Sequence, residues 1–501
     1  MDHDKASELE KFKSNEKCEK ENEKRICENG ENAKSNRPLK RQAIMAMGTF
    51  MLTLGAGATA GFSAILIPQL KHERHGHIST EMVSWVAATA SLALLFGNLL
   101  SGYLMERYGR RNSQVVLAVF FISGWVVIGF AKNMAMILVG RFITGLSQGW
   151  LGPLGPVFIG EISTPAYRGF FLAGLSLAIA VGVLMSHVFG TLLHWSYASL
   201  LCGLFPLIGG VILYFAPETP AWLATQNRID KCIESFKWYR GTCPEMKAEL
   251  DKIIAAQEKR DQSMSKLSAL KANIVKPEFY KPLTIMTVFF IMTQLSGVNV
   301  ISAYTTDLVK ELMGSKKYAD AAMLSLDVLR CASLLVACVL LKKKGRRPMA
   351  MISGIFTSLS LIALAIYMFS VKRNRISPVI TIGLMTVYMI VSNLGVVPLP
   401  WNMVGELFAT ETKGIGSGIS VMTTSVAYFA TIKTAPGMLE GLGHHGTYMF
   451  YGLSTLLGTI YLYFYLPETR GKTLLQIEEY FRYGKKGRTK DVDNDASIPC
   501  V

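Results

Sequence analysis

Two charged side chains, Asp327 and Arg330, lie three residues apart in a stretch that is otherwise almost free of charge. On a helix this spacing places both groups on one face, where they can form an ion pair. Lys433 is a third charge within an apolar stretch. Such charges are costly in apolar surroundings unless they pair or line a polar cavity. We expect a structural Asp327–Arg330 pair, with a direct substrate role for Arg330 as the alternative.

Uncharged polar groups form a second candidate site. Gln294, Ser296 and Asn299 share one apolar stretch, and Trp401 follows the break at Pro398-Leu-Pro400 in another. Side-chain amides offer both donors and acceptors to hydroxyl groups, and an indole face packs against the C–H side of a sugar ring. These residue types indicate a binding site for a hydroxylated solute.

The loops show no arrangement that points to catalysis. We find no nucleophile–base pair, and Cys232 and Cys243 lack the spacing and the partner histidines of a metal site. We therefore expect no enzyme activity, no catalytic residue, no metal and no cofactor.

The elements that must position these groups are long apolar runs. Half of the 501 residues are apolar, 18% are charged, and the mean hydropathy is +0.31. A bilayer core needs ~20 apolar helical residues per crossing. This pattern excludes a soluble enzyme, a disulfide-stapled secreted domain and a nucleic-acid binder. It predicts an all-α polytopic protein with twelve transmembrane spans, at about 44–70, 81–104, 114–131, 134–159, 169–190, 194–216, 282–306, 318–341, 348–371, 376–405, 414–436 and 446–466.

The net charge of +16 gives the orientation. With these spans, the basic clusters fall on one side of the membrane, except for Lys372, Arg373 and Arg375. Positive loops mark the cytosolic face. We expect a multi-pass protein of the plasma membrane with both termini in the cytosol. The lipid bilayer is then a partner, and nucleic acid is not.

Three motifs occur twice in the same order. Tyr108-Gly-Arg-Arg111 is echoed by Lys344-Gly-Arg-Arg347, the segment 160–169 by 405–414, and Pro217-Glu-Thr by Pro467-Glu-Thr. The repeat predicts two pseudo-symmetric six-helix halves with a binding site between them. The expected organisation is a disordered tail at 1–42, halves at 43–216 and 282–466, a cytoplasmic loop with short helices at 217–281, and a C-terminal tail at 467–501.

The repeated motifs also place acids and bases at the predicted cytoplasmic helix ends. Glu106, Arg107, Arg110 and Arg111 lie between the second and third spans, and Glu161 and Arg168 between the fourth and fifth. Pairing between helix ends would form a latch that breaks when the cytoplasmic side opens. The alternative is simple retention of positive charge on the cytosolic side.

The first predicted span carries no Asp or Glu between Met45 and Leu70. A proton-coupled carrier needs a titratable acid in its pathway, so the sequence favours passive transport. Asp327 or Asp307 could supply the acid instead.

Over roughly residues 43–480 the sequence resembles the sugar porter family of the major facilitator superfamily, and within it the insect-type facilitated trehalose transporters. The motifs that carry the resemblance are Glu106-Arg-Tyr-Gly-Arg-Arg111, Gly140-Arg-Phe, Pro217-Glu-Thr-Pro220, Gln294-Leu-Ser-Gly-Val-Asn299, Pro398-Leu-Pro-Trp401 and Pro467-Glu-Thr-Arg-Gly-Lys-Thr473.

The resemblance implies a carrier that works by alternating access. It implies sugar-binding roles for Gln294, Asn299 and Trp401, and an outer-gate role for Tyr304. It also implies a cytoplasmic salt-bridge network formed by Glu106, Arg107, Arg111, Glu161, Arg168, Arg346, Arg347, Glu406 and Lys413.

Several positions depart from the family pattern. Ser176 stands where a sugar-binding Gln is usual, Thr293 replaces a Gln, and Arg330 occupies an Asn position. We expect a facilitative transporter of trehalose or a hexose, with no obligate protein partner. The alternatives are a carrier of a polyol or an organic anion that uses Arg330, or a sugar-sensing receptor that does not transport.

Overall fold

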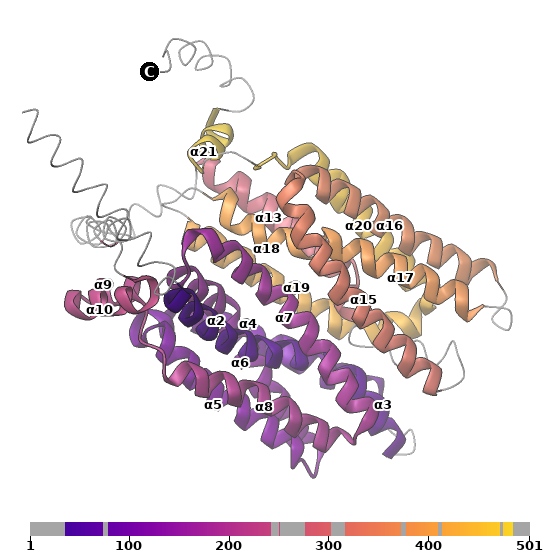
Figure 1. Ribbon diagram of the computed structural model, residues 1–501. Coiled ribbons are helices and arrows are strands. Elements are labelled where there is room, and N and C mark those ends of the chain that lie inside the picture. The colour runs from indigo at the N-terminus through magenta and orange to yellow at the C-terminus, as the bar shows by residue number, and fades with distance from the viewer. Residues whose placement is uncertain are drawn as a thin grey trace, which may run out of the picture.

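The computed structural model describes residues 36–73, 79–241, 250, 276–301, 316–371, 377–408, 413–470 and 474–483. Within these ranges every regular element is a helix. Eight of the described helical segments are long and apolar enough to cross a membrane. The helices form an elongated bundle in which the two halves of the chain lie side by side (Figure 1).

The first half contains seven helices among the described residues. They are α2 (Asn36–Gly61), α3 (Ser63–Glu73), α4 (Thr80–Tyr108), α5 (Arg110–Gly129), α6 (Met134–Ile162), α7 (Pro165–Leu192) and α8 (Trp195–Tyr214). Local signals set several of the starts. The Ser79 hydroxyl accepts from the Met82 N–H at α4, the Asn133 amide accepts from the Met136 N–H at α6, and Pro165 opens α7.

Two short helices follow, α9 (Pro220–Thr225) and α10 (Ile229–Arg240). They pack against the ends of α2 and α4. The Trp222 indole donates to the Glu106 carbonyl oxygen over 2.9 Å, and the Gln42 amide donates to the Tyr239 carbonyl oxygen over 2.8 Å. We call this end of the bundle, which carries Arg110 and Arg346, the basic end, and the opposite end the far end.

The second half repeats the pattern. Its helices are α13 (Pro277–Leu295), α15 (Lys316–Lys343), α16 (Arg346–Ser370), α17 (Pro378–Leu394), α18 (Pro398–Leu407), α19 (Lys413–Gly441) and α20 (Gly443–Tyr465), with the short α21 (Leu474–Tyr483) at the basic end. The Arg482 guanidinium fixes α21 to α13 through an ion pair of 2.8 Å with Glu278.

Close packing within each half depends on small residues. A Cβ atom on Gly57 of α2 would lie 2.1 Å from the Ile179 carbonyl oxygen of α7, and one on Gly149 of α6 would lie 2.1 Å from the Leu94 carbonyl oxygen of α4. Only glycine allows these backbones to approach so closely. The two halves, by contrast, contact each other mainly through α4 with α19 and α7 with α15.

The helices lie over the predicted spans, with three differences. The first span is broken at Phe62 between α2 and α3. The tenth span is also broken, into α17 and α18 before Pro398, in agreement with the break expected at Pro398-Leu-Pro400. Proline lacks the N–H that would continue the ladder. The first helix begins at Asn36, inside the segment predicted as a disordered tail, and α13 begins at Pro277, inside the predicted loop.

Candidate functional site

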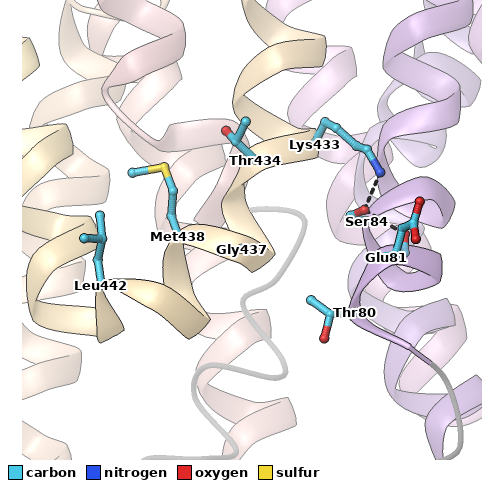
Figure 2. Close-up of a pocket in the computed structure, with 8 residues that line it drawn as sticks. All are labelled: Thr80, Glu81, Ser84, Lys433, Thr434, Gly437, Met438 and Leu442. Carbon is cyan, nitrogen blue, oxygen red and sulfur yellow. Dashed lines mark hydrogen bonds between the residues drawn. The ribbon is translucent and has the colours of Figure 1, made fainter.

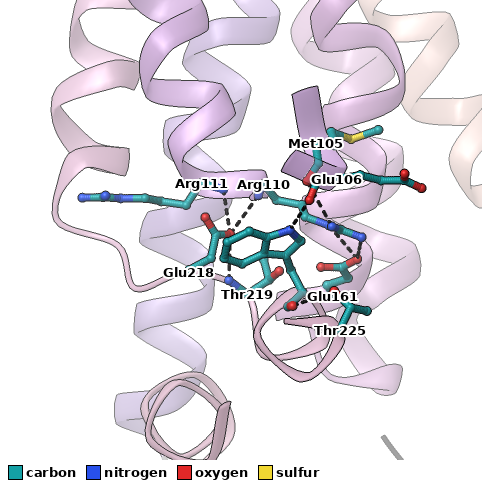
Figure 3. A network of polar contacts seen from close by, with 9 residues as sticks. Met105, Glu106, Arg110, Arg111, Glu161, Glu218, Thr219 and Thr225 are labelled. Carbon is teal, nitrogen blue, oxygen red and sulfur yellow. Dashed lines mark hydrogen bonds and ion pairs between the residues drawn. The ribbon is translucent and has the colours of Figure 1, made fainter. Parts of the chain in front are cut away.

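At the basic end, one glutamate caps a helix that belongs to another part of the chain. Glu218 Oε1 accepts hydrogen bonds of 2.9 Å from the backbone N–H groups of both Arg110 and Arg111, at the start of α5 (Figure 3). Gly109 precedes this helix with a φ of 93°, and a Cβ atom there would lie 2.3 Å from the Glu218 carboxylate. The carboxylate therefore supplies the cap that α5 lacks in its own sequence, and its charge suits the helix dipole.

The second half contains the same device. Glu468 accepts from the backbone N–H groups of Arg346 at 2.9 Å and Arg347 at 3.1 Å, at the start of α16. Gly345 again makes room, since a Cβ atom there would lie 2.2 Å from the carboxylate. Partial burial raises the pKa of Glu468, but the surrounding backbone N–H groups outweigh it and hold the pKa below its usual value.

The arginine side chains at these two sites are also arranged alike. The Arg111 guanidinium donates to the Leu213 carbonyl oxygen over 3.2 Å and lies over the Tyr214 ring. The Arg347 guanidinium donates to the Tyr463 carbonyl oxygen over 2.7 Å and lies over the Tyr463 ring. Each arginine thus fixes the start of one helix to the end of the last long helix in its own half.

Glu161 pairs with Arg110, one of the bases expected at the cytoplasmic helix ends, although the resemblance did not place Arg110 in the salt-bridge network. Its carboxylate lies 3.1 Å from the Arg110 guanidinium (Figure 3), and its carbonyl oxygen accepts from Arg240. Arg107 stacks instead on the rings of Tyr103 and Tyr108. Arg168 forms no ion pair with a residue that the structure describes.

These contacts each lie within one half of the chain, so they brace the helix ends of that half. The side chains of Glu406 and Lys413 lie outside the described residues, as does Tyr304. A latch between the halves and a gate at Tyr304 therefore stay predictions.

The predicted amide pair lies where α13 ends. Asn299 donates to Gln294 Oε1 over 2.6 Å, across a turn in which Gly297 has a φ of 78°. A Cβ atom on Gly297 would lie 2.8 Å from the Tyr451 ring, so both the conformation and the packing require glycine. The structure thus brings Gln294 and Asn299 together at a break in a long helix.

Trp401 lies in the first turn of α18, directly after the break in the tenth span. Its side chain is 48% exposed, although its ring contacts Phe290 of α13 edge-on at 5.2 Å. The indole is thus held in place on one side by Phe290 and remains partly exposed.

The expected Asp327–Arg330 pair is not the contact that Asp327 makes. Its carboxylate pairs with Nδ1 of His187, from α7 of the other half, and Nε2 of His187 lies 3.1 Å from the Gly61 carbonyl oxygen. The i, i+3 spacing predicts reach along a helix only and says nothing about α7, which lies against α15. Arg330 is buried on the next turn of α15.

Lys433 also joins the two halves. Its ammonium group donates to the Ser84 hydroxyl over 2.7 Å and lies 4.0 Å from the centre of the Trp85 ring. It borders an open pocket of about 450 Å³ between the first turns of α4 and the last turns of α19 (Figure 2). At the same far end, Thr80 donates to Glu440.

Sequence reasoning missed several of these residues. The Pro-Glu-Thr repeat includes Glu218 and Glu468, but it did not predict that these residues cap helices. Asn98 of α4 donates to Ser425 of α19 over 2.7 Å, and no local pattern marks this pair. Arg141 lies buried in α6, where it donates to the Thr59 carbonyl oxygen over 2.7 Å.

Comparison with known proteins supports the same architecture. The chain is 30% identical over 465 residues to the facilitated trehalose transporter Tret1 of Drosophila grimshawi, a match that covers 91% of this chain and 49% of that protein. The Tret1 of Apis mellifera ligustica is 27% identical, and the match covers 92% of each chain. The chain thus spans about half the length of several insect relatives that it matches.

Solved structures show the same fold. The inward-open xylose transporter XylE of E. coli superposes with a TM-score of 0.72, at 20% identity, over 88% of this chain and 99% of XylE. A second XylE structure, described as a major facilitator superfamily proton:xylose symporter, gives a TM-score of 0.71 at 19% identity, over 89% of this chain and 99% of XylE. The family model for "Sugar (and other) transporter" matches residues 42–481, so the chain belongs to that family and has the two-half fold of the major facilitator superfamily.

Proposed function

We propose that this protein is a facilitative sugar transporter of the plasma membrane, for trehalose or a hexose, and that it works by alternating access. The main support is the arrangement of the two halves. Each half is tightly packed and has its own caps at the basic end, whereas the halves, in the part of the chain that the structure describes, contact each other mainly through two helix pairs, α4 with α19 and α7 with α15. Such a molecule can rock about its central site without unfolding either half.

The sugar site that we propose is formed by Gln294, Asn299 and Trp401. One hydrogen bond joins the two amides, which leaves amide donors on Gln294 and an acceptor on Asn299 for sugar hydroxyls. The open face of Trp401 can pack against the C–H side of a sugar ring. A few hydrogen bonds of ~0.5–1.5 kcal/mol each reach the ~4 kcal/mol that corresponds to millimolar affinity. Weak binding suits a carrier, which must also release its solute.

The basic end faces the cytosol in this proposal. Arg107, Arg110 and Arg111 gather there with Arg346 and Arg347, as the positive-inside rule requires. Both termini then lie in the cytosol, and the far end with Thr80 and Glu440 faces outward.

A second candidate solute is an organic anion. The observation that favours it is Arg330, a guanidinium that is buried on a helix at the boundary between the halves. Such a charge is found where it binds a partner or a charged solute.

Counter-flow in proteoliposomes tests these proposals. Labelled trehalose, glucose and a panel of small acids are offered to the wild type and to Trp401→Ala, Trp401→Phe and Arg330→Asn. We expect saturable sugar exchange that Trp401→Ala abolishes and Trp401→Phe partly retains, because phenylalanine keeps an aromatic face.

Two other outcomes would replace the proposal. Acid exchange that Arg330→Asn abolishes, without sugar exchange, would show an anion carrier. Sugar binding without exchange would show a sugar-sensing receptor.

A further inference from the structure

The pair of His187 and Asp327 joins the two halves and does not include any of the proposed sugar residues. The two side chains are 1% and 7% exposed, so the contact is sealed from water. His187 comes from α7 and Asp327 from α15, two helices that the halves must separate to open. When a buried contact between two ionisable groups forms or breaks as the halves move, the number of protons bound by the two groups changes.

The hydrogen bonds fix how many protons the pair holds. A carbonyl oxygen only accepts, so Nε2 of His187, 3.1 Å from the Gly61 oxygen, must carry a hydrogen. A neutral imidazole then has no hydrogen on Nδ1, the atom that contacts the Asp327 carboxylate. A hydrogen bond there needs one more proton, either on Nδ1 or on the carboxyl group. The pair thus holds one proton more than a neutral histidine and an ionised aspartate.

Gly61 places the His187 ring at the end of a helix. It is the last residue of α2, so its carbonyl group belongs to the negative end of a helix dipole. A Cβ atom on Gly61 would lie 2.7 Å from the Ser186 hydroxyl and 3.1 Å from His187 Nε2. Glycine therefore allows the ring to reach the helix end.

Among the residues that the structure describes, the other ionisable groups near the pair come from four helices. Arg330 follows Asp327 by one turn on α15, and Arg141 of α6 donates to Thr59 and Ser63 on α2 and α3, next to Gly61. Tyr428 of α19 interacts electrostatically with both guanidinium groups, and Tyr388 of α17 interacts with Arg330. When the halves part, Asp327 loses His187 but keeps Arg330 within reach on its own helix face. The contact that needs the extra proton is then lost.

We propose that closure of the far end takes up one proton at His187–Asp327 and that opening returns it to the same, outer side. His187 lies only a few residues before the far-end terminus of α7 at Leu192, so opening the far end exposes the pair to the outer solution. The sugar cycle therefore stays uncoupled, while external pH sets the balance between its states. This proposal rests on the alternating access proposed above. One linked proton changes the closed-to-open ratio by up to about tenfold per pH unit.

A cross-linking assay reads the far end directly and needs no sugar. Thr80 and Glu440 contact each other across the halves, so Thr80→Cys with Glu440→Cys reports closure to a short bifunctional thiol reagent. We expect the cross-linked fraction to rise as external pH falls. Thiol reactivity changes in the opposite direction, so it cannot produce this result. His187→Gln and Asp327→Asn each remove one ionisable group of the pair. When either is added to the cysteine reporter, the cross-linked fraction should no longer rise as external pH falls.

A matched control is His194→Gln. His194 pairs with Glu73, but both lie in the first half, so this variant should keep the pH response of the parent reporter. Gel filtration checks that each variant is folded. Because His187→Gln and Asp327→Asn disrupt the same pair, the test can still be made if one of them does not fold.

Three results would overturn the proposal. They are a cross-linked fraction that does not rise on acidification in the parent reporter, an undiminished response in folded His187→Gln and Asp327→Asn, or sugar-driven proton entry into liposomes, which requires release of the proton to the cytosolic side. If sugar exchange is absent but the reporter still responds to pH, the proton-linked closure stands and the proposed substrate fails.

Discussion

Removal of the Glu218 carboxylate tests whether the basic end is held by helix capping. Glu218→Ala leaves the N–H groups of Arg110 and Arg111 at the start of α5 without the acceptor that each reaches at 2.9 Å. An unmade hydrogen bond of this kind costs ~1–3 kcal/mol, less where water can reach the group. We expect unfolding to be easier by ~2–4 kcal/mol, which for a half of this size corresponds to roughly 4–16 °C in the melting temperature.

The assay is thermal unfolding in detergent, followed by fluorescence-detected gel filtration. Glu218→Gln separates charge from hydrogen bonding, since its amide oxygen still accepts, so we expect about half of the alanine effect. Glu234→Ala is the control, because Glu234 is an exposed acid on α10 close by in the chain, and exposed substitutions stay within about 0.5 kcal/mol. A melting temperature that is unchanged in Glu218→Ala, or an equal loss in Glu234→Ala, would refute the capping role.

Three further predictions follow from the same contacts. Since the pKa of Glu468 is lowered, its stabilising effect is full above the unfolded value of ~4.3 and is lost as pH falls through the folded value; the melting temperatures of wild type and Glu468→Gln should differ at neutral pH and converge below about pH 4. Gly57→Val places a Cβ atom 2.1 Å from a backbone oxygen of α7, so yield and melting temperature should fall sharply, whereas Gly160→Ala, with no atom within 4 Å, should behave as wild type. Lys433→Met removes the 2.7 Å hydrogen bond to Ser84 at the far end, worth ~1 kcal/mol when partly exposed; the outward-open state should gain, and the external half-saturation constant for sugar should fall up to roughly fivefold, whereas an unchanged or higher constant would contradict this.

The sequence by itself determined the membrane class and the two-half architecture. Apolar runs of bilayer length form transmembrane helices, because unpaired backbone N–H and C=O groups are too costly in lipid and a helix pairs them all. Repeated motifs also identify equivalent positions without any knowledge of their contacts. Gln294 and Asn299 could be assigned to one candidate site from sequence because they share a single apolar stretch.

Only the tertiary structure decided which groups meet across long separations. Asp327 was expected to pair with Arg330 on its own helix, but it contacts His187, which lies 140 residues away. Glu161 pairs with Arg110, and the Glu218 carboxylate caps the start of α5, which lies more than 100 residues earlier in the chain. Periodicity describes one helix at a time, whereas these contacts depend on how helices pack. A buried charge pairs with whatever the neighbouring helix presents, and that neighbour is set by the fold.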